Sequence, residues 1–192
     1  MSRYPAAIWM PGPDWKTEPG SRVPSGVVHH SAVGYRAGLL SVLHGTRRAS
    51  WHFSVLQDGT VWQHYDTTQI AWHAQGANPK CVGCEHEGGF SPANEPLTPA
   101  QLAASIDLTR WLGHEHNFRL QRAGGPGQTL WEHNDWWPAT SCPSGRIPWA
   151  RYTEEDDMAD EQLTIAILRA LGAVAAGTPT AAQVALVRAV VQ

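Results

Sequence analysis

Two adjacent histidines, a distant third histidine and a cysteine are the side chains in this sequence best suited to hold a metal ion. They are His29 or His30 in GVVHHSA, His133 in EHND, and Cys142 in TSCP. Two imidazoles and one thiolate suit Zn²⁺, and three protein ligands leave a fourth position for water, as in catalytic zinc sites. Eight residues separate His133 from Cys142, whereas structural zinc sites usually pair their ligands about two to four residues apart. A zinc site built from these residues would be catalytic. The alternative is histidines that serve only the surface, and the spacing alone does not decide between the two.

The size and charge of the chain limit the remaining possibilities. Its 192 residues, 42% of them hydrophobic, fit one ordinary domain with a real core. The charges are nearly balanced, with 14 basic and 17 acidic residues and a net charge of -3. Such a chain has no positive field to attract nucleic acid or an anionic membrane, so we expect neither as a partner.

We expect neither a transmembrane span nor a secretory leader from this sequence. No window approaches the roughly 20 apolar residues that cross a bilayer, and the first residues lack a charged segment followed by an apolar one. We therefore expect synthesis in the cytoplasm and no membrane insertion. We also expect a monomeric protein.

Cys81 and Cys84 form a C-x-x-C pair, but in a strand these positions lie roughly 10 Å apart, which argues against a redox disulfide.

Apolar patterning and turn residues predict a mixed order of strands and helices. The expected elements are a strand at 25–32, a helix at 37–45, a hairpin at 52–65 with a two-residue turn at Asp58-Gly59, a strand at 81–89, a long helix that begins after Thr98, and an irregular loop at 130–145. This order predicts an α/β fold with a central mixed β-sheet flanked by helices.

Three segments follow from the changes in composition along the chain. Residues 1–24 carry five prolines and predict an irregular arm laid over the domain. Residues 25–151 hold every candidate ligand and form the expected zinc domain. Residues 152–192 are first acidic and then rich in Ala, Leu and Val, which predicts a helical C-terminal segment.

Five segments in register resemble one enzyme family. VVHHSA, SWHFSVLQDGTV, AWHA, CVGCEHEGG and EHNDWWPATSCPSG are similar, in that order, to the type 2 N-acetylmuramoyl-L-alanine amidases and peptidoglycan-recognition proteins. The resemblance covers roughly residues 20–150, and YPAAIW and AWHA look most like endolysins of actinobacterial phages. It implies the amidase type 2 fold and a zinc cofactor.

The resemblance also implies which residues form the site. The family's strand ligand is a His followed by one variable residue and then Ser or Thr, which selects His29 rather than His30. His133 and Cys142 match the second and third ligands. Thr140 stands where relatives place a Lys or Thr that stabilises the oxyanion; its hydroxyl can donate a hydrogen bond without a positive charge.

Proton transfer is assigned by the same resemblance to Glu85, where many phage relatives have a glutamate that acts on the attacking water. Trp51 stands where lysozyme-like phage members have a catalytic Tyr, and it has no ionisable hydroxyl to replace it. Trp51, Trp72 and His73 are the residues we expect along the substrate groove, with a purely structural role as the alternative for His73.

The function implied is zinc-dependent hydrolysis of the amide bond between N-acetylmuramic acid and L-Ala of peptidoglycan, by an endolysin that is made in the host cytoplasm and acts on the cell wall after release. Two alternatives stay open. One is a recognition module that binds peptidoglycan without cleaving it, and the other is an amidase that recycles soluble muropeptides.

Overall fold

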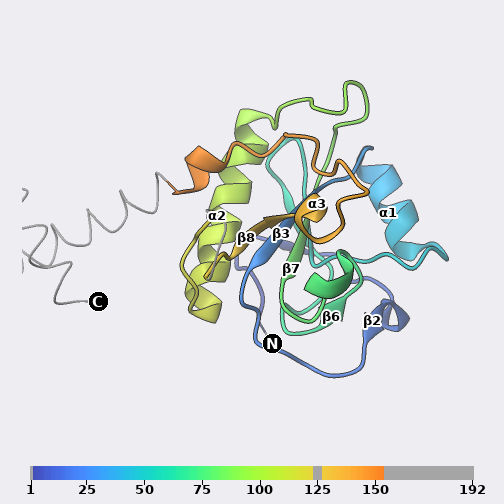
Figure 1. The fold of residues 1–192 in the computed structure, drawn as a ribbon. Coiled ribbons are helices and arrows are strands. Elements are labelled where there is room, and N and C mark those ends of the chain that lie inside the picture. The colour runs from blue at the N-terminus through green and yellow to red at the C-terminus, as the bar shows by residue number, and fades with distance from the viewer. Residues whose placement is uncertain (1, 123–126, 154–192) are drawn as a thin grey trace, which may run out of the picture. The chain divides into compact units, whose positions relative to one another are not determined.

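A mixed six-stranded sheet forms the centre of the protein (Figure 1). The computed structural model describes residues 2–122 and 127–153. The strands are β1 (Ile8–Trp9), β3 (Val27–Ser31), β4 (Phe53–Val55), β5 (Val61–Gln63), β7 (Val82–His86) and β8 (Leu130–Glu132), in the spatial order β1-β5-β4-β7-β3-β8. β3 lies between β7 and β8 and is parallel to both, whereas β4 and β5 are antiparallel. The predicted mixed sheet is confirmed.

Helices cover both faces of this sheet. They are α1 (Arg36–His44), α2 (Pro99–His116) and α3 (His133–Trp136); two short 3₁₀ turns, η1 (Asp14–Lys16) and η2 (Gln75–Ala77), and a small antiparallel pair, β2 (Thr17–Glu18) with β6 (Ile70–Ala71), complete the described elements. Val27 packs in one cluster with Leu108 and Leu112 of α2. Its neighbour Val28 packs in another with Trp136 of α3. Successive residues of β3 therefore face different helices, as strand geometry requires.

Local signals in the sequence place the main elements correctly. The Thr98 side chain caps α2 by accepting a hydrogen bond from the Gln101 N–H at 3.1 Å, and Pro99 occupies the first helical position. The hairpin forms where expected, but its turn has three residues rather than two. Leu56 N–H donates to the Thr60 carbonyl at 2.9 Å, and Gly59 has a positive φ of 87° while Asp58 does not. A three-residue turn needs positive φ at one position alone.

Two expectations about irregular segments are wrong. The N-terminal segment 1–24 is not irregular throughout, because β1 adds a parallel strand to the edge of the main sheet. The segment 130–145 is not a loop throughout either, since it begins with β8 and α3. Both strands are short, and their pairing partners lie far away in the sequence, so no local pattern marks them.

The chain divides into two compact units, Met1–Trp149 and Ala150–Gln192. The expected helical segment at 152–192 lies, from residue 154 onward, outside the described residues. None of the helices within the described ranges has both the length and the apolar character that a bilayer span requires.

Candidate active site

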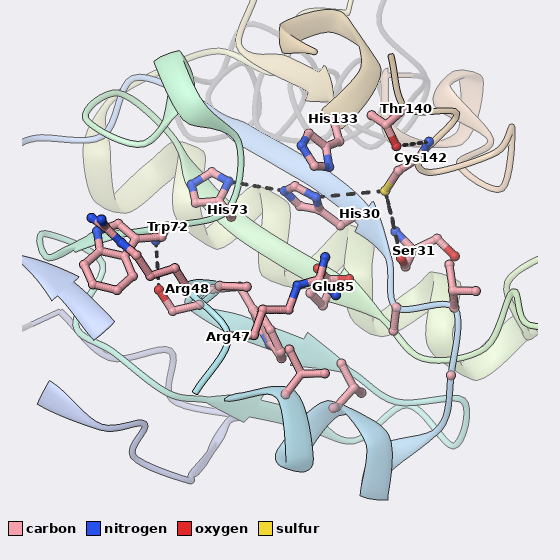
Figure 2. Close-up of a pocket in the computed structure, with 18 of the residues that line it drawn as sticks. His30, Ser31, Arg47, Arg48, Trp72, His73, Glu85, His133, Thr140 and Cys142 are labelled. Carbon is pink, nitrogen blue, oxygen red and sulfur yellow. Dashed lines mark hydrogen bonds between the residues drawn. The ribbon is translucent and has the colours of Figure 1, made fainter. Parts of the chain in front are cut away.

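Three potential metal ligands meet at one end of the sheet. His30 lies near the end of β3, His133 is the first residue of α3 directly after β8, and Cys142 lies in the loop that follows. One ligand atom from each of the three side chains lies within 4.8 Å of the others. The Cys142 Sγ is 4.0 Å from the His30 Nδ1, and the His30 and His133 rings are 4.7 Å apart. Figure 2 shows the three side chains converging on one side of the pocket.

The choice of His29 over His30 as the strand ligand is corrected by this arrangement. His29 is fully buried on the opposite face of β3, where its ring stacks on His86 at 5.3 Å and meets the edge of Trp149 at 5.2 Å. Because adjacent strand residues point to opposite faces, His29 cannot reach His133 and Cys142 while His30 does.

The donor set of His30, His133 and Cys142 fits a zinc ion. Ligand atoms of a tetrahedral zinc site with nitrogen and sulfur donors lie roughly 3.3–3.8 Å apart, given the usual bond lengths. The 4.0 Å between the Cys142 Sγ and the His30 Nδ1 is close to that spacing. Burial raises the pKa of the Cys142 thiol to about 12, so a bound cation must displace its proton.

The loop that carries Cys142 is tied to the sheet by several hydrogen bonds. Ser31 N–H donates to the Cys142 Sγ at 3.2 Å, and the Thr140 Oγ accepts a hydrogen bond from the Cys142 N–H at 3.2 Å. The Asn134 N–H donates to the Cys142 carbonyl at 3.0 Å, which links the loop to α3. Thr140 therefore lies at the pocket wall beside the proposed third ligand, as Figure 2 shows.

Arg146 is a positioning residue that the sequence did not single out. Its guanidinium donates to the Ser31 Oγ at 2.9 Å and to the carbonyls of His86 and Glu87 at 3.2 and 2.9 Å. These bonds join the segment after Cys142 to the ends of β3 and β7. Such a role depends on backbone carbonyls of distant strands, which leave no motif in the sequence.

Glu85 is placed on the same face as His30. It lies on β7, where it is the register partner of His30 across the parallel β3–β7 pair, and it lines the same pocket. Its Oε2 is buried without a hydrogen-bond partner among the described residues. Burial raises the pKa of the Glu85 carboxyl to about 7, against the opposing influence of Arg47 and then Arg146. A carboxyl with that pKa can both accept and release a proton near neutral pH.

The pocket beside these groups has a volume of about 560 Å³. Trp72 and Arg48 form one wall, with the Arg48 guanidinium 4.5 Å from the centre of the Trp72 ring. Trp51 also lines the pocket, but it is only 4% exposed and its indole N–H donates to the Ser54 Oγ at 2.8 Å. Among the three groove residues expected from sequence, Trp72 is thus the most available to a ligand.

His73 is the least available of those three, because both of its ring nitrogens have protein partners. Its Nδ1 lies 3.2 Å from the His30 Nε2, and its Nε2 lies 3.0 Å from the Cys81 carbonyl. Burial lowers the pKa of His73 to about 3, with smaller contributions from Arg22 and His133 in the same direction. His73 is therefore a neutral imidazole held inside the pocket wall.

Comparisons with known proteins identify the family and agree with the fold. The family model for N-acetylmuramoyl-L-alanine amidase matches residues 19–145. The chain is 30% identical over 106 residues to N-acetylmuramoyl-L-alanine amidase A of Achromobacter lyticus, an alignment that covers 54% of this chain and 59% of that protein. The chain thus spans little more than half the length of that relative.

Solved structures show the same architecture. The amidase LysC from Clostridium intestinale URNW superposes with a TM-score of 0.62 at 21% identity, covering 80% of this chain and 99% of that one. The catalytic domain of XlyA superposes with a TM-score of 0.58 at 22% identity, covering 77% and 97%. The chain belongs to the N-acetylmuramoyl-L-alanine amidase family, which confirms the resemblance found in the sequence.

Proposed function

We propose that this protein is a zinc-dependent N-acetylmuramoyl-L-alanine amidase that cleaves peptidoglycan between N-acetylmuramic acid and L-Ala. In this proposal His30, His133 and Cys142 hold the zinc ion. One observation carries it: three zinc-type ligand atoms within 4.8 Å of one another, at a pocket that also contains the unpartnered Glu85 carboxyl oxygen.

The bound ion would polarise the substrate carbonyl and lower the pKa of water to about 7. Glu85 then takes the proton from the attacking water as the new C–O bond forms. When the C–N bond breaks, Glu85 returns this proton to the amine of L-Ala. The products are a free carboxyl group on the lactyl side and a free amino terminus on the stem peptide. A carboxyl with a pKa of about 7 suits both steps.

Thr140 and Trp72 complete the proposed machinery. The Thr140 Oγ accepts from the Cys142 N–H, which leaves its own proton free to donate to the oxyanion. The Trp72 ring, with Arg48 over it, offers a flat apolar surface for the sugar or the stem peptide. Trp51 and His73 would shape the pocket from within rather than bind the substrate by hydrogen bonds, since their polar atoms already have partners.

The biological role we propose is that of an endolysin, made in the host cytoplasm and acting on the cell wall after release. Similarity to the endolysin LysCS from Clostridium intestinale URNW, with a TM-score of 0.59 at 22% identity over 82% of this chain, supports that choice. Intact sacculi, rather than soluble muropeptides, are then the preferred substrate.

The decisive experiment incubates the purified full chain with sacculi and measures new amino-terminal Ala. We expect release by the zinc-loaded protein, loss of release after chelation, and recovery on addition of zinc. Protein that sediments with sacculi but exposes no new amino groups would be a recognition module. Cleavage of soluble muropeptides alone would indicate recycling in place of lysis.

A further inference from the structure

His73 is the middle member of a chain of three polar groups, which begins at the proposed ligand His30 and ends at the Cys81 backbone carbonyl. The His30 Nε2 and the His73 Nδ1 are 3.2 Å apart, and the His73 Nε2 is 3.0 Å from the Cys81 carbonyl oxygen. Figure 2 shows the two rings in line, with the other nitrogen of His30 directed at Cys142. Both imidazoles are buried, with 2% of His30 and 9% of His73 exposed.

The direction of each hydrogen bond in this chain follows from the group at its end. A carbonyl oxygen accepts and cannot donate, so the His73 Nε2 must carry its proton. The Nδ1 of the neutral His73 ring is then an acceptor, and the His30 Nε2 must donate to it. His30 is thereby left with a lone pair on Nδ1, the atom 4.0 Å from the Cys142 Sγ. The Cys81 carbonyl thus selects the metal-facing tautomer of His30 across two rings.

Several contacts hold His73 in this position. The Asn78 Oδ1 accepts hydrogen bonds from the backbone N–H groups of His73 and Ala74 at 3.0 and 2.8 Å. Gly83 of β7 lies against the ring, since a Cβ at that position would come within 2.6 Å of the His73 Cγ. A glycine that weakens a strand by its own propensity is here required by the approach of the imidazole. Arg22 also donates to the Cys81 carbonyl, at 2.8 Å.

We propose that His73 is a positioning residue that fixes His30 in the tautomer protonated at Nε2, so that Nδ1 is available to the metal. The proposal rests on the zinc site of the proposed function and adds to it a group that acts through the ligand His30. Metal-binding histidines usually donate their second N–H to a carboxylate, a carbonyl or water, and loss of that partner typically costs 10- to 100-fold in metal affinity. Here a second imidazole stands between the ligand and the carbonyl.

The test compares two substitutions of nearly the same shape, His73→Asn and His73→Leu. Both remove the bond to the Cys81 carbonyl, but the Asn side chain keeps an acceptor close to the place of Nδ1 and the Leu side chain does not. We expect His73→Leu to lower the zinc affinity about 10- to 100-fold and His73→Asn to retain most of it. Thermal unfolding of the metal-free variants measures the shared loss of stability separately.

A control variant removes a comparable buried imidazole that contacts no ligand. His64 donates from Nδ1 to the Met10 carbonyl at 2.6 Å and accepts at Nε2 from the Ser54 hydroxyl at 2.8 Å. His64→Gln is expected to lose stability and to keep its zinc affinity. Equal zinc affinity in wild type and His73→Leu, or equal losses in His73→Leu and His73→Asn, would overturn the positioning role.

The tautomer itself can be observed without metal. In the ¹⁵N-labelled metal-free protein, the imidazole shifts of His30 should show a protonated Nε2 and a bare Nδ1, and His73→Leu should remove that preference. The opposite tautomer in the wild type would overturn the inference. Failure of the wild type to bind zinc at all would instead count against the proposed function, because the metal-free spectrum reports on the hydrogen bonds alone.

Discussion

The two faces of β3 give adjacent histidines opposite roles. On one face His30 meets His133 and Cys142 at the wall of an open pocket. On the other face, which α2 covers, His29 is fully buried against His86 and Trp149. Burial is the main cause that lowers the pKa of both imidazoles, so both are neutral.

Residue type and burial therefore do not distinguish a ligand from a core residue here. The difference lies in the partners that the fold brings to each face. A cysteine and a third histidine reach the His30 side through α3 and the loop after it, while aromatic rings close the His29 side. The same alternation continues on β7, where Glu85 faces the pocket and the fully buried Cys84 belongs to the core cluster that includes Leu108 and Leu112 of α2.

The largest effect is expected when each of the two histidines is replaced by alanine in turn. His30→Ala should lower the zinc affinity by more than the 10- to 100-fold expected when a ligand loses its hydrogen-bond partner. Hydrolysis of sacculi should be lost with the zinc. His29→Ala should keep stoichiometric zinc and lose stability by roughly 2–5 kcal/mol, as other large-to-small core substitutions do. Metal analysis together with denaturant unfolding measures both. Zinc retained in His30→Ala and lost in a folded His29→Ala would reverse the assignment.

The next effect concerns neighbouring residues of β7. Glu85→Gln should lower kcat about 10²- to 10⁴-fold while zinc stays bound, because the amide cannot accept the proton of the attacking water. Cys84→Ala, one residue earlier on the core face, should lower stability and leave kcat close to that of the wild type. The measurement is kcat, with the zinc content determined on the same samples. A kcat of Glu85→Gln close to that of the wild type would exclude Glu85 from the proposed mechanism.

The smallest effect is a dependence of stability on pH that originates on the His29 face. Burial lowers the pKa of His86 from 6.5 to about 4. Between these values the unfolded chain binds a proton that the native protein does not, so the free energy of unfolding falls as the pH drops from about 6.5 to about 4. The contribution of His86 is at most about 3 kcal/mol.

His86→Gln tests this contribution because the amide does not titrate. Denaturant unfolding of the metal-free proteins across this pH range should give a shallower slope for the variant than for the wild type. Identical slopes would mean that His86 also binds a proton in the native protein over this pH range. The His29 face of the sheet would then not exclude charge as the structure indicates.

Several parts of the fold could be predicted because their signals are local. The β-branched run before His29 predicts β3, Thr98 followed by Pro99 marks the start of α2, and Asp58-Gly59 places the hairpin. β1 and β8 could not be predicted in this way. They have two and three residues, and they exist because a distant strand offers its free hydrogen-bonding edge.

The same distinction applies to the site. His133 and Cys142 were found from residue type and from resemblance, and the structure brings them together. His73 was expected to line the groove, and it does, but its hydrogen bonds to His30 and the Cys81 carbonyl depend on strands that meet only in the folded protein.

By itself, the sequence determined the mixed α/β order and, through motifs that follow one another in the family's order, the family. It also supplied the candidate donor set of two imidazoles and one thiolate, because residue type and motif order are properties of the chain alone. It also established that one histidine of the pair must face away from the other. Only the tertiary structure decided which of these two histidines points toward Cys142. Alternation along a strand puts the two side chains on opposite faces, but the packing of the rest of the chain determines which face each one occupies.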